Sequence, residues 1–144
     1  MSVSSLTRRT LLLGLLVAGC ARAQPTSLSY DGLVAALEES GASVETVGDI
    51  EQVFFSVPGR SLRVDGADVQ VFEYVDEAAR QADSDLISTD GSTIGTSMVT
   101  WIDQPNFWAE GRLIVLYVGR EAAVFERLSG VLGDPLTEPW PRQG

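Results

Sequence analysis

The side chains of this 144-residue chain that could carry out chemistry are carboxylates, hydroxyls and one thiol. There are 20 acidic residues, Cys20 is the only cysteine, and the sequence contains no histidine. Without histidine there is no Ser-His-Asp triad, Cys-His pair or imidazole metal site. With one cysteine there is no internal disulfide, thiolate zinc site or CxxC redox pair. The remaining candidates are the thiol itself and pairs of carboxylates.

Carboxylates are the candidates for catalysis, because acid–base chemistry by two acids needs no histidine. Glu73, Asp103 and Glu110 lie at or near predicted strands, but nothing in the sequence fixes their separation. Serine and threonine are abundant, yet lysine and histidine, the usual activating bases, are both absent. We therefore expect no catalytic residue and no cofactor, and a carboxylate-dependent hydrolase remains an alternative.

The most polar connecting segment spans residues 87–96, and Asp83, Asp85 and Asp90 lie in or near it. Carboxylate, hydroxyl and carbonyl oxygens are the ligands of calcium. The spacing of these acids does not match an EF-hand loop. A hydroxyl-rich turn that satisfies its own backbone is the favoured interpretation, so we expect no metal site.

Aromatic residues gather in two segments that the sequence predicts as turns. Trp101, Phe107 and Trp108 fall within eight residues around a Pro-Asn pair, and Phe55 lies in a second aromatic segment. Exposed aromatic side chains suit recognition of a partner or ligand, because they offer large contact areas at low entropy cost. Core packing is the favoured interpretation, and a partner or ligand surface formed by these four residues is the alternative.

Two arginines in the middle of the chain could hold an anion. Arg60 and Arg63 lie close together in a predicted strand. Since acids outnumber cations two to one, we expect both arginines to pair with acids instead.

The first 20 residues have the layout of an export signal. Arg8 and Arg9 precede a nine-residue apolar run from Leu11 to Gly19, and this stretch has no acid. A membrane-spanning helix needs about 20 apolar residues. The shorter run fits the core of a signal peptide, and a buried N-terminal helix is the alternative.

The run Val17-Ala18-Gly19-Cys20 resembles the lipobox of bacterial lipoprotein precursors, in which an aliphatic and two small residues precede an obligatory cysteine. The resemblance covers residues 1–20. It implies cleavage before Cys20 and attachment of diacylglyceryl and fatty acids such as palmitate to this residue. Two or more acyl chains hold a protein stably on a membrane. The resemblance thus implies an extracytoplasmic protein anchored to the cell membrane or, because Ala21 follows the cysteine, to the periplasmic side of an outer membrane.

Two other interpretations of the same stretch stay open. Ala21-Arg22-Ala23 has the A-x-A form of an ordinary signal-peptidase site, whose use would release a soluble secreted or periplasmic domain that begins at Gln24. Residues 7–12 also resemble part of a twin-arginine signal, which exports folded proteins. We favour the lipobox because the only cysteine stands where that motif needs one.

The remainder of the chain is interpreted as one acidic domain. Loss of residues 1–19 removes two arginines and no acid, which changes the net charge from −10 to −12. Such a domain is unsuited to phosphate backbones, so we expect no nucleic-acid partner. Residues 20–29 are interpreted as a tether, residues 30–133 as the domain, and the proline-rich residues 134–144 as an irregular tail.

Hydrophobic patterns and caps predict the elements of the domain. Helices are expected over residues 32–40 with Asp31 as N-cap, from Asp76 to about 84–86, and over 121–132. Strands are expected over 42–47, 53–57, 60–64, 67–74, 97–102 and 112–118, the last in the centre of the sheet because it is apolar on both faces. Asp65-Gly66 predicts a type I′ turn.

The order of elements predicts an α+β domain with a single antiparallel sheet packed by two to three helices on one face, similar to a ferredoxin-type sandwich. A fold of this class assigns no activity. The mature region resembles small exported bacterial proteins to which no activity is assigned. The expectation is a noncatalytic binding or interaction module at the cell envelope, anchored to the membrane through Cys20, with an envelope protein or a small ligand as partner.

Overall fold

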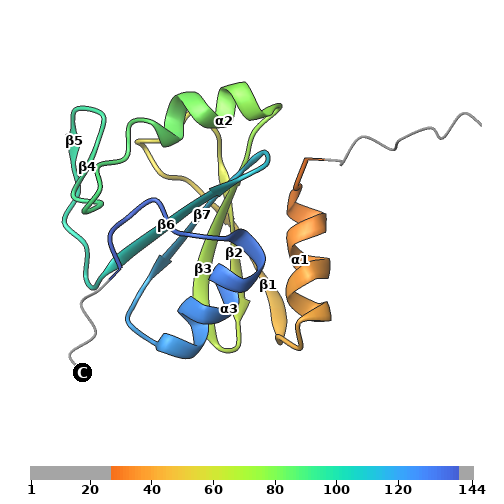
Figure 1. Ribbon diagram of the computed structural model, residues 1–144. Helices are drawn as coiled ribbons and strands as arrows, with labels where there is room; N and C mark the ends of the chain where they lie inside the picture. Colours follow the sequence, from red (N-terminus) through yellow and green to blue (C-terminus); the bar gives the residue numbers. More distant parts are fainter. Residues whose placement is uncertain (1–26, 140–144) are drawn as a thin grey trace, which may run out of the picture.

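Five strands form one antiparallel sheet in the order β1-β2-β3-β7-β6 in the computed structural model, which describes residues 27–139 (Figure 1). They are β1 (Val44–Ile50), β2 (Gly59–Val64), β3 (Ala67–Glu73), β6 (Pro105–Glu110) and β7 (Leu113–Val118). A separate hairpin contains β4 (Thr93–Ile94) and β5 (Ser97–Met98). The helices are α1 (Tyr30–Glu39), α2 (Glu77–Ser84) and α3 (Ala122–Leu132). The predicted α+β class is confirmed.

The predicted signal peptide, Cys20 and most of the predicted tether lie outside the described residues. Among residues 27–139, no helix is both long enough and apolar enough to cross a membrane.

The β2–β3 hairpin has the register that its turn sequence predicts. Asp65 and Gly66 have φ of 50° and 85°, as a type I′ turn requires at both central positions. Leu62 pairs with Val69, and Arg63 lies opposite Asp68. Both predicted cross-strand pairs are confirmed.

The β3–α2–β6 segment forms a split β-α-β unit. Strands β3 and β6 are each antiparallel to β7, which lies between them, so they run parallel to one another. Such units occur in ferredoxin-type sandwiches. The apolar strand β7, predicted in the centre of the sheet, is an interior strand next to the edge strand β6, and the middle strand is β3.

Helices α1 and α3 cover one face of the sheet (Figure 1). Their inward side chains pack against alternate residues of β2, β3 and β7 and against one residue of β6. The packed side chains include Leu33, Leu37, Trp108, Leu128 and Leu132. Every one of these is at most 3% exposed, so this layer is the main hydrophobic core of the domain.

The second face of the sheet is also covered, so the prediction of helices on one face only is wrong. Phe72, Phe107, Ile114 and Leu116 project from that face and pack with the loop residue Phe55. Ala79 of α2 and several loop side chains complete this cluster. A strand that is apolar on both faces, as β7 is, requires cover on both.

Two strand predictions are wrong. Residues 53–57 form turns and bends, and the strand expected over 97–102 is replaced by the short β5 and then by β6, which begins at Pro105. The Pro-Asn pair therefore starts a strand instead of making a turn. Proline is accepted at the first position of an edge strand, and the side-chain amide of Asn106 donates to the carbonyls of Tyr117 and Gly119.

The two edges of the sheet differ. The segment after α3 covers β6, because the Leu136 N–H donates to the Phe107 carbonyl at 2.7 Å and the Phe107 N–H donates to Thr137 Oγ1 at 3.1 Å. In β1, by contrast, residues 45–49 are all exposed. Strand β1 is thus the accessible edge of the described sheet.

Candidate binding cleft

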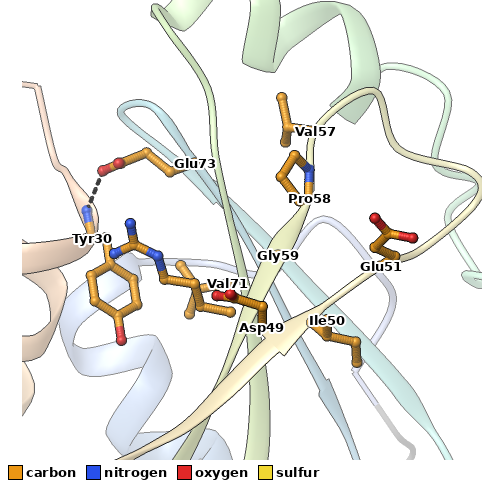
Figure 2. Close-up of a pocket in the computed structure, with 10 residues that line it drawn as sticks. Tyr30, Asp49, Ile50, Glu51, Val57, Pro58, Gly59, Val71 and Glu73 are labelled. Carbon is orange, nitrogen blue, oxygen red and sulfur yellow. Dashed lines mark hydrogen bonds between the residues drawn. The ribbon is translucent and has the colours of Figure 1, made fainter.

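A cleft of about 490 Å³ opens between the start of α1 and the end of β1 (Figure 2). Tyr30 and Glu73 lie at the left of this view, Glu51 lies at the right, and Asp49 lies between them, with Val57 above. Small-molecule sites usually have volumes of about 300–1,000 Å³. The full lining is Tyr30, Asp49, Ile50, Glu51, Val57, Pro58, Gly59, Arg60, Val71 and Glu73.

The α1 side of the cleft is held in place by Glu73. Its carboxylate accepts the backbone N–H of Tyr30 at 2.6 Å (Figure 2). The same carboxylate lies 3.4 Å from a guanidinium nitrogen of Arg112. The first N–H groups of a helix have no partner within the helix, and a carboxylate there also complements the helix dipole. Glu73 therefore joins α1 to β3.

The N-cap of α1 is Ser29, whose Oγ accepts the Gly32 N–H at 3.2 Å. The prediction of Asp31 as N-cap is wrong, because the helix begins two residues earlier than its apolar pattern indicates. The earlier start places Tyr30 in the first turn, beside the cleft.

The cation of the cleft is Arg60, whose guanidinium carbon lies 4.3 Å from the centre of the Tyr30 ring. This is a cation–π contact. Within residues 27–139, no ion pair or hydrogen bond engages the Arg60 guanidinium, so the expectation that it pairs with an acid is wrong. Arg63, by comparison, lies 3.8 Å from Glu45 and 3.6 Å from Asp68.

Strand geometry explains the different environments of the two arginines. Positions 60 and 63 differ by an odd number, so their side chains point to opposite faces of the sheet. Arg60 faces α1, while Arg63 faces away from that helix and pairs with its strand neighbours. This spacing was the one signal in the sequence that could have distinguished them.

Two acids on the β1 side of the cleft are unpaired. Asp49 lies opposite Arg60 in the strand register, and Glu51 follows two residues later. Both residues are exposed, and no described residue forms an ion pair or hydrogen bond with either carboxylate. The cleft thus presents accessible charges of both signs.

The third wall of the cleft, at Val57 and Pro58, is fixed by Asp83 of α2. One oxygen of this carboxylate accepts the Ser56 N–H at 2.8 Å, the Ser56 hydroxyl at 2.7 Å and the Tyr74 hydroxyl at 2.8 Å. Burial raises the pKa of Asp83, but the hydrogen bonds from Ser56 and Tyr74 outweigh it, so the pKa is lowered overall. The anion therefore holds the 51–58 loop against the domain.

The aromatic residues proposed as a surface lie elsewhere, and most are in the core. Phe107 and Trp108 are 0% exposed and Phe55 is 8% exposed. Trp101 is half-buried, and its indole N–H donates to the Gly91 carbonyl at 2.7 Å. None of the four lines the cleft, and three of them have no accessible ring to offer a partner.

The acids proposed for catalysis are not gathered in one pocket. Glu73 of β3 and Glu110 of β6 pair with Leu113 of β7 from its two sides. Their backbones are therefore two strand spacings apart, about 10 Å. Asp103 is at the other end of the sheet, 2.6 Å from Arg120. Because the Glu73 carboxylate also serves the α1 terminus, these three acids do not form a catalytic pair.

The polar loop satisfies its own groups. One oxygen of Asp90 accepts the Ser92 N–H and the hydroxyls of Ser88 and Ser92, and these bonds lower the pKa of Asp90 to about 2. In the described part of the chain no group of three or more acids or cysteines could hold a metal ion.

Comparisons with protein families, curated proteins and solved structures give no match to this chain.

Proposed function

We propose that the protein is a lipid-anchored binding module of the cell envelope, and that the cleft beside Arg60 is its binding site. The observation that carries the binding role is the Arg60 guanidinium, which rests on the Tyr30 ring and has no acidic partner among the described residues. A positioned and accessible guanidinium can form bidentate hydrogen bonds to a ligand anion. This role needs no catalytic group.

The anchor is proposed from the lipobox-like run that ends at Cys20. Six residues separate Cys20 from Ser27, and seven extended steps span at most about 25 Å. Acyl chains on Cys20 would therefore keep the start of the domain near the bilayer.

The point where the chain enters the domain is defined by contacts. The Ser27 hydroxyl donates to Glu77 at 2.7 Å, and the Arg112 N–H donates to the Leu28 carbonyl at 3.1 Å. The start of α2 and the β6–β7 turn would thus face the membrane. Because Tyr30 lies directly after this point, the cleft would lie at the same end of the domain.

Detergent phase partitioning of the expressed protein tests the anchor. Wild type is expected in the detergent phase, and Cys20→Ser in the aqueous phase. An Ala23→Leu variant, which spoils the competing A-x-A site, is expected to partition as wild type does. Recovery of wild type and Cys20→Ser together in the aqueous phase would exclude the anchor and favour a soluble exported domain.

A further inference from the structure

We infer that the cleft takes a small zwitterion, a molecule that carries an ammonium group and a carboxylate or phosphate a few bonds apart. This inference rests on the proposed binding role of the cleft and names its ligand class. Free amino acids, the ends of short peptides and the phosphoethanolamine group of a lipid share this chemistry.

The cleft is lined by charges of both signs. Its acids are Asp49, Glu51 and Glu73, and its one cation is Arg60. Glu73 is already engaged by the Tyr30 N–H and by Arg112. The groups left for a ligand are therefore one guanidinium and two carboxylates.

A ligand with a single sign of charge does not suit this set. A simple anion would pair with Arg60 but would be repelled by Asp49 and Glu51. A simple cation would pair with the acids and be repelled by Arg60. A zwitterion can give its anionic group to the guanidinium and its ammonium group to a carboxylate, so both attractions are used at once.

Asp49 is the cross-strand neighbour of Arg60, so the acid that lies apart from the guanidinium is Glu51. Arg60 is held over the ring of Tyr30, at the α1 side, whereas Glu51 lies on the far side of the cleft in Figure 2. Ile50 and Val57, which are partly exposed, line the space together with the exposed Pro58. These could contact an aliphatic side chain, which favours an amino acid or peptide with such a side chain among the zwitterions.

The orientation follows from the same positions. The carboxylate or phosphate of the ligand lies against Arg60, the ammonium group lies towards Asp49 and Glu51, and the aliphatic part lies over Val57 and Pro58. This arrangement makes separate predictions for the two ends of the ligand.

Calorimetric titration of the mature chain with Cys20→Ser tests the inference. The probes are valyl-valine, its N-acetyl form, its C-terminal amide and glycerophosphoethanolamine. We expect valyl-valine or glycerophosphoethanolamine to bind, and each blocked dipeptide to bind at least about tenfold more weakly than valyl-valine. The two unblocked probes show whether the zwitterion comes from a peptide or from a lipid headgroup.

Variants locate the site. Arg60→Gln should weaken binding about tenfold and make the C-terminal amide bind as well as the free dipeptide. The double variant Asp49→Asn and Glu51→Gln should likewise make the N-acetyl form bind as well as free valyl-valine. Arg63→Gln is the matched control, because this arginine lies on the same strand but on the opposite face, and it should leave the affinity unchanged.

The titrations and the detergent partitioning of the Cys20 variant can fail independently. If none of the four probes binds, or if Arg63→Gln weakens binding as much as Arg60→Gln does, the zwitterion inference is wrong. If the blocked dipeptides bind as well as valyl-valine and shift the backbone amide resonances of Ile50 and Gly59, the cleft binds ligands but does not select zwitterions. Detergent partitioning reports on Cys20 independently of all these results.

Discussion

The carboxylate of Glu73 accepts the backbone N–H of Tyr30 at 2.6 Å, across 43 residues of sequence. This contact fixes the start of α1 against β3 and sets one wall of the cleft. The same carboxylate lies 3.4 Å from a guanidinium nitrogen of Arg112. Glu73 of β3 therefore contacts both the start of α1 and an arginine directly before β7.

Replacing Glu73 by Gln should destabilise the domain by about 1–2 kcal/mol, because the helix terminus and Arg112 both lose a charged partner. The midpoint of urea unfolding measures this change. Glu45→Gln is the control: its ion pair with Arg63 is exposed, so a change below about 0.5 kcal/mol is expected. Equal effects of the two substitutions would show that the Glu73 contact has no special role.

Tyr30→Phe should leave stability unchanged or raise it by up to about 1 kcal/mol. The Tyr30 hydroxyl is buried and has no hydrogen-bond partner among the described residues, and a buried polar group without a partner is unfavourable. The ring beneath Arg60 is retained. A clear loss of stability in thermal unfolding would mean that the hydroxyl has a partner in solution.

Trp108→Ala should lower the free energy of unfolding by about 3–5 kcal/mol, because the side chain is fully buried between the sheet and α3. Ile102 is 100% exposed, and Ile102→Ala should change stability by less than about 0.5 kcal/mol. Chemical denaturation of both variants measures the difference. A small effect of Trp108→Ala would contradict the core position of this residue.

Two glycines give a matched pair. Gly111 has a φ of +56°, and a Cβ there would collide with the backbone of Leu28, so Gly111→Ala should destabilise by more than about 1 kcal/mol. Gly130 lies inside α3, and a Cβ there meets nothing within 4 Å. Gly130→Ala should therefore stabilise by about 0.5–1 kcal/mol. In thermal unfolding we expect Gly111→Ala to lower the melting temperature and Gly130→Ala to raise it. A rise in melting temperature for both variants would be inconsistent with the packing of residues 27–29 on the β6–β7 turn.

Acid should weaken the loop contact made by Asp83. Its pKa is lower in the folded protein than the ordinary value of 3.8, so its stabilising effect is present above about pH 4 and is lost as the pH falls through the folded pKa. The difference in unfolding free energy between wild type and Asp83→Asn should thus shrink from pH 6 to pH 2.5. A difference that stays constant over this range would contradict the role of the anion.

Local signals in the sequence predicted the elements that depend on local chemistry. The Asp65-Gly66 turn fixed the β2–β3 register, and the N-cap Asp76 marked the start of α2, where its carboxylate accepts the Ala79 N–H at 2.8 Å. Both follow from contacts within a few residues of each other.

The errors arose where distant contacts outweigh local pattern. The 53–57 segment is aromatic and β-branched, but it is held as a loop because Ser56 binds Asp83, 27 residues away. Strand β6 contains a Pro-Asn pair that usually marks a turn, yet Asn106 bonds to the carbonyls around β7. Sequence pattern carries no information on such partners.

The cleft was not predictable for the same reason. Its charged groups come from β1, β2 and β3 and from the loop after β1, and its aromatic ring comes from α1. The contacts of Tyr30 with Glu73 and with Arg60, 43 and 30 residues away along the chain, hold that helix against the sheet at this point. The odd spacing of the two arginines indicates that they lie on opposite faces of the sheet, but it does not indicate which face carries the α1 ring and which carries the acids.

The intact mass of the protein isolated from its native membrane fraction decides whether this domain is held at the membrane through Cys20. We expect a polypeptide that begins at Cys20 and carries the added mass of a diacylglyceryl group. An unmodified polypeptide that begins at Gln24, or one that keeps residues 1–19, would contradict it.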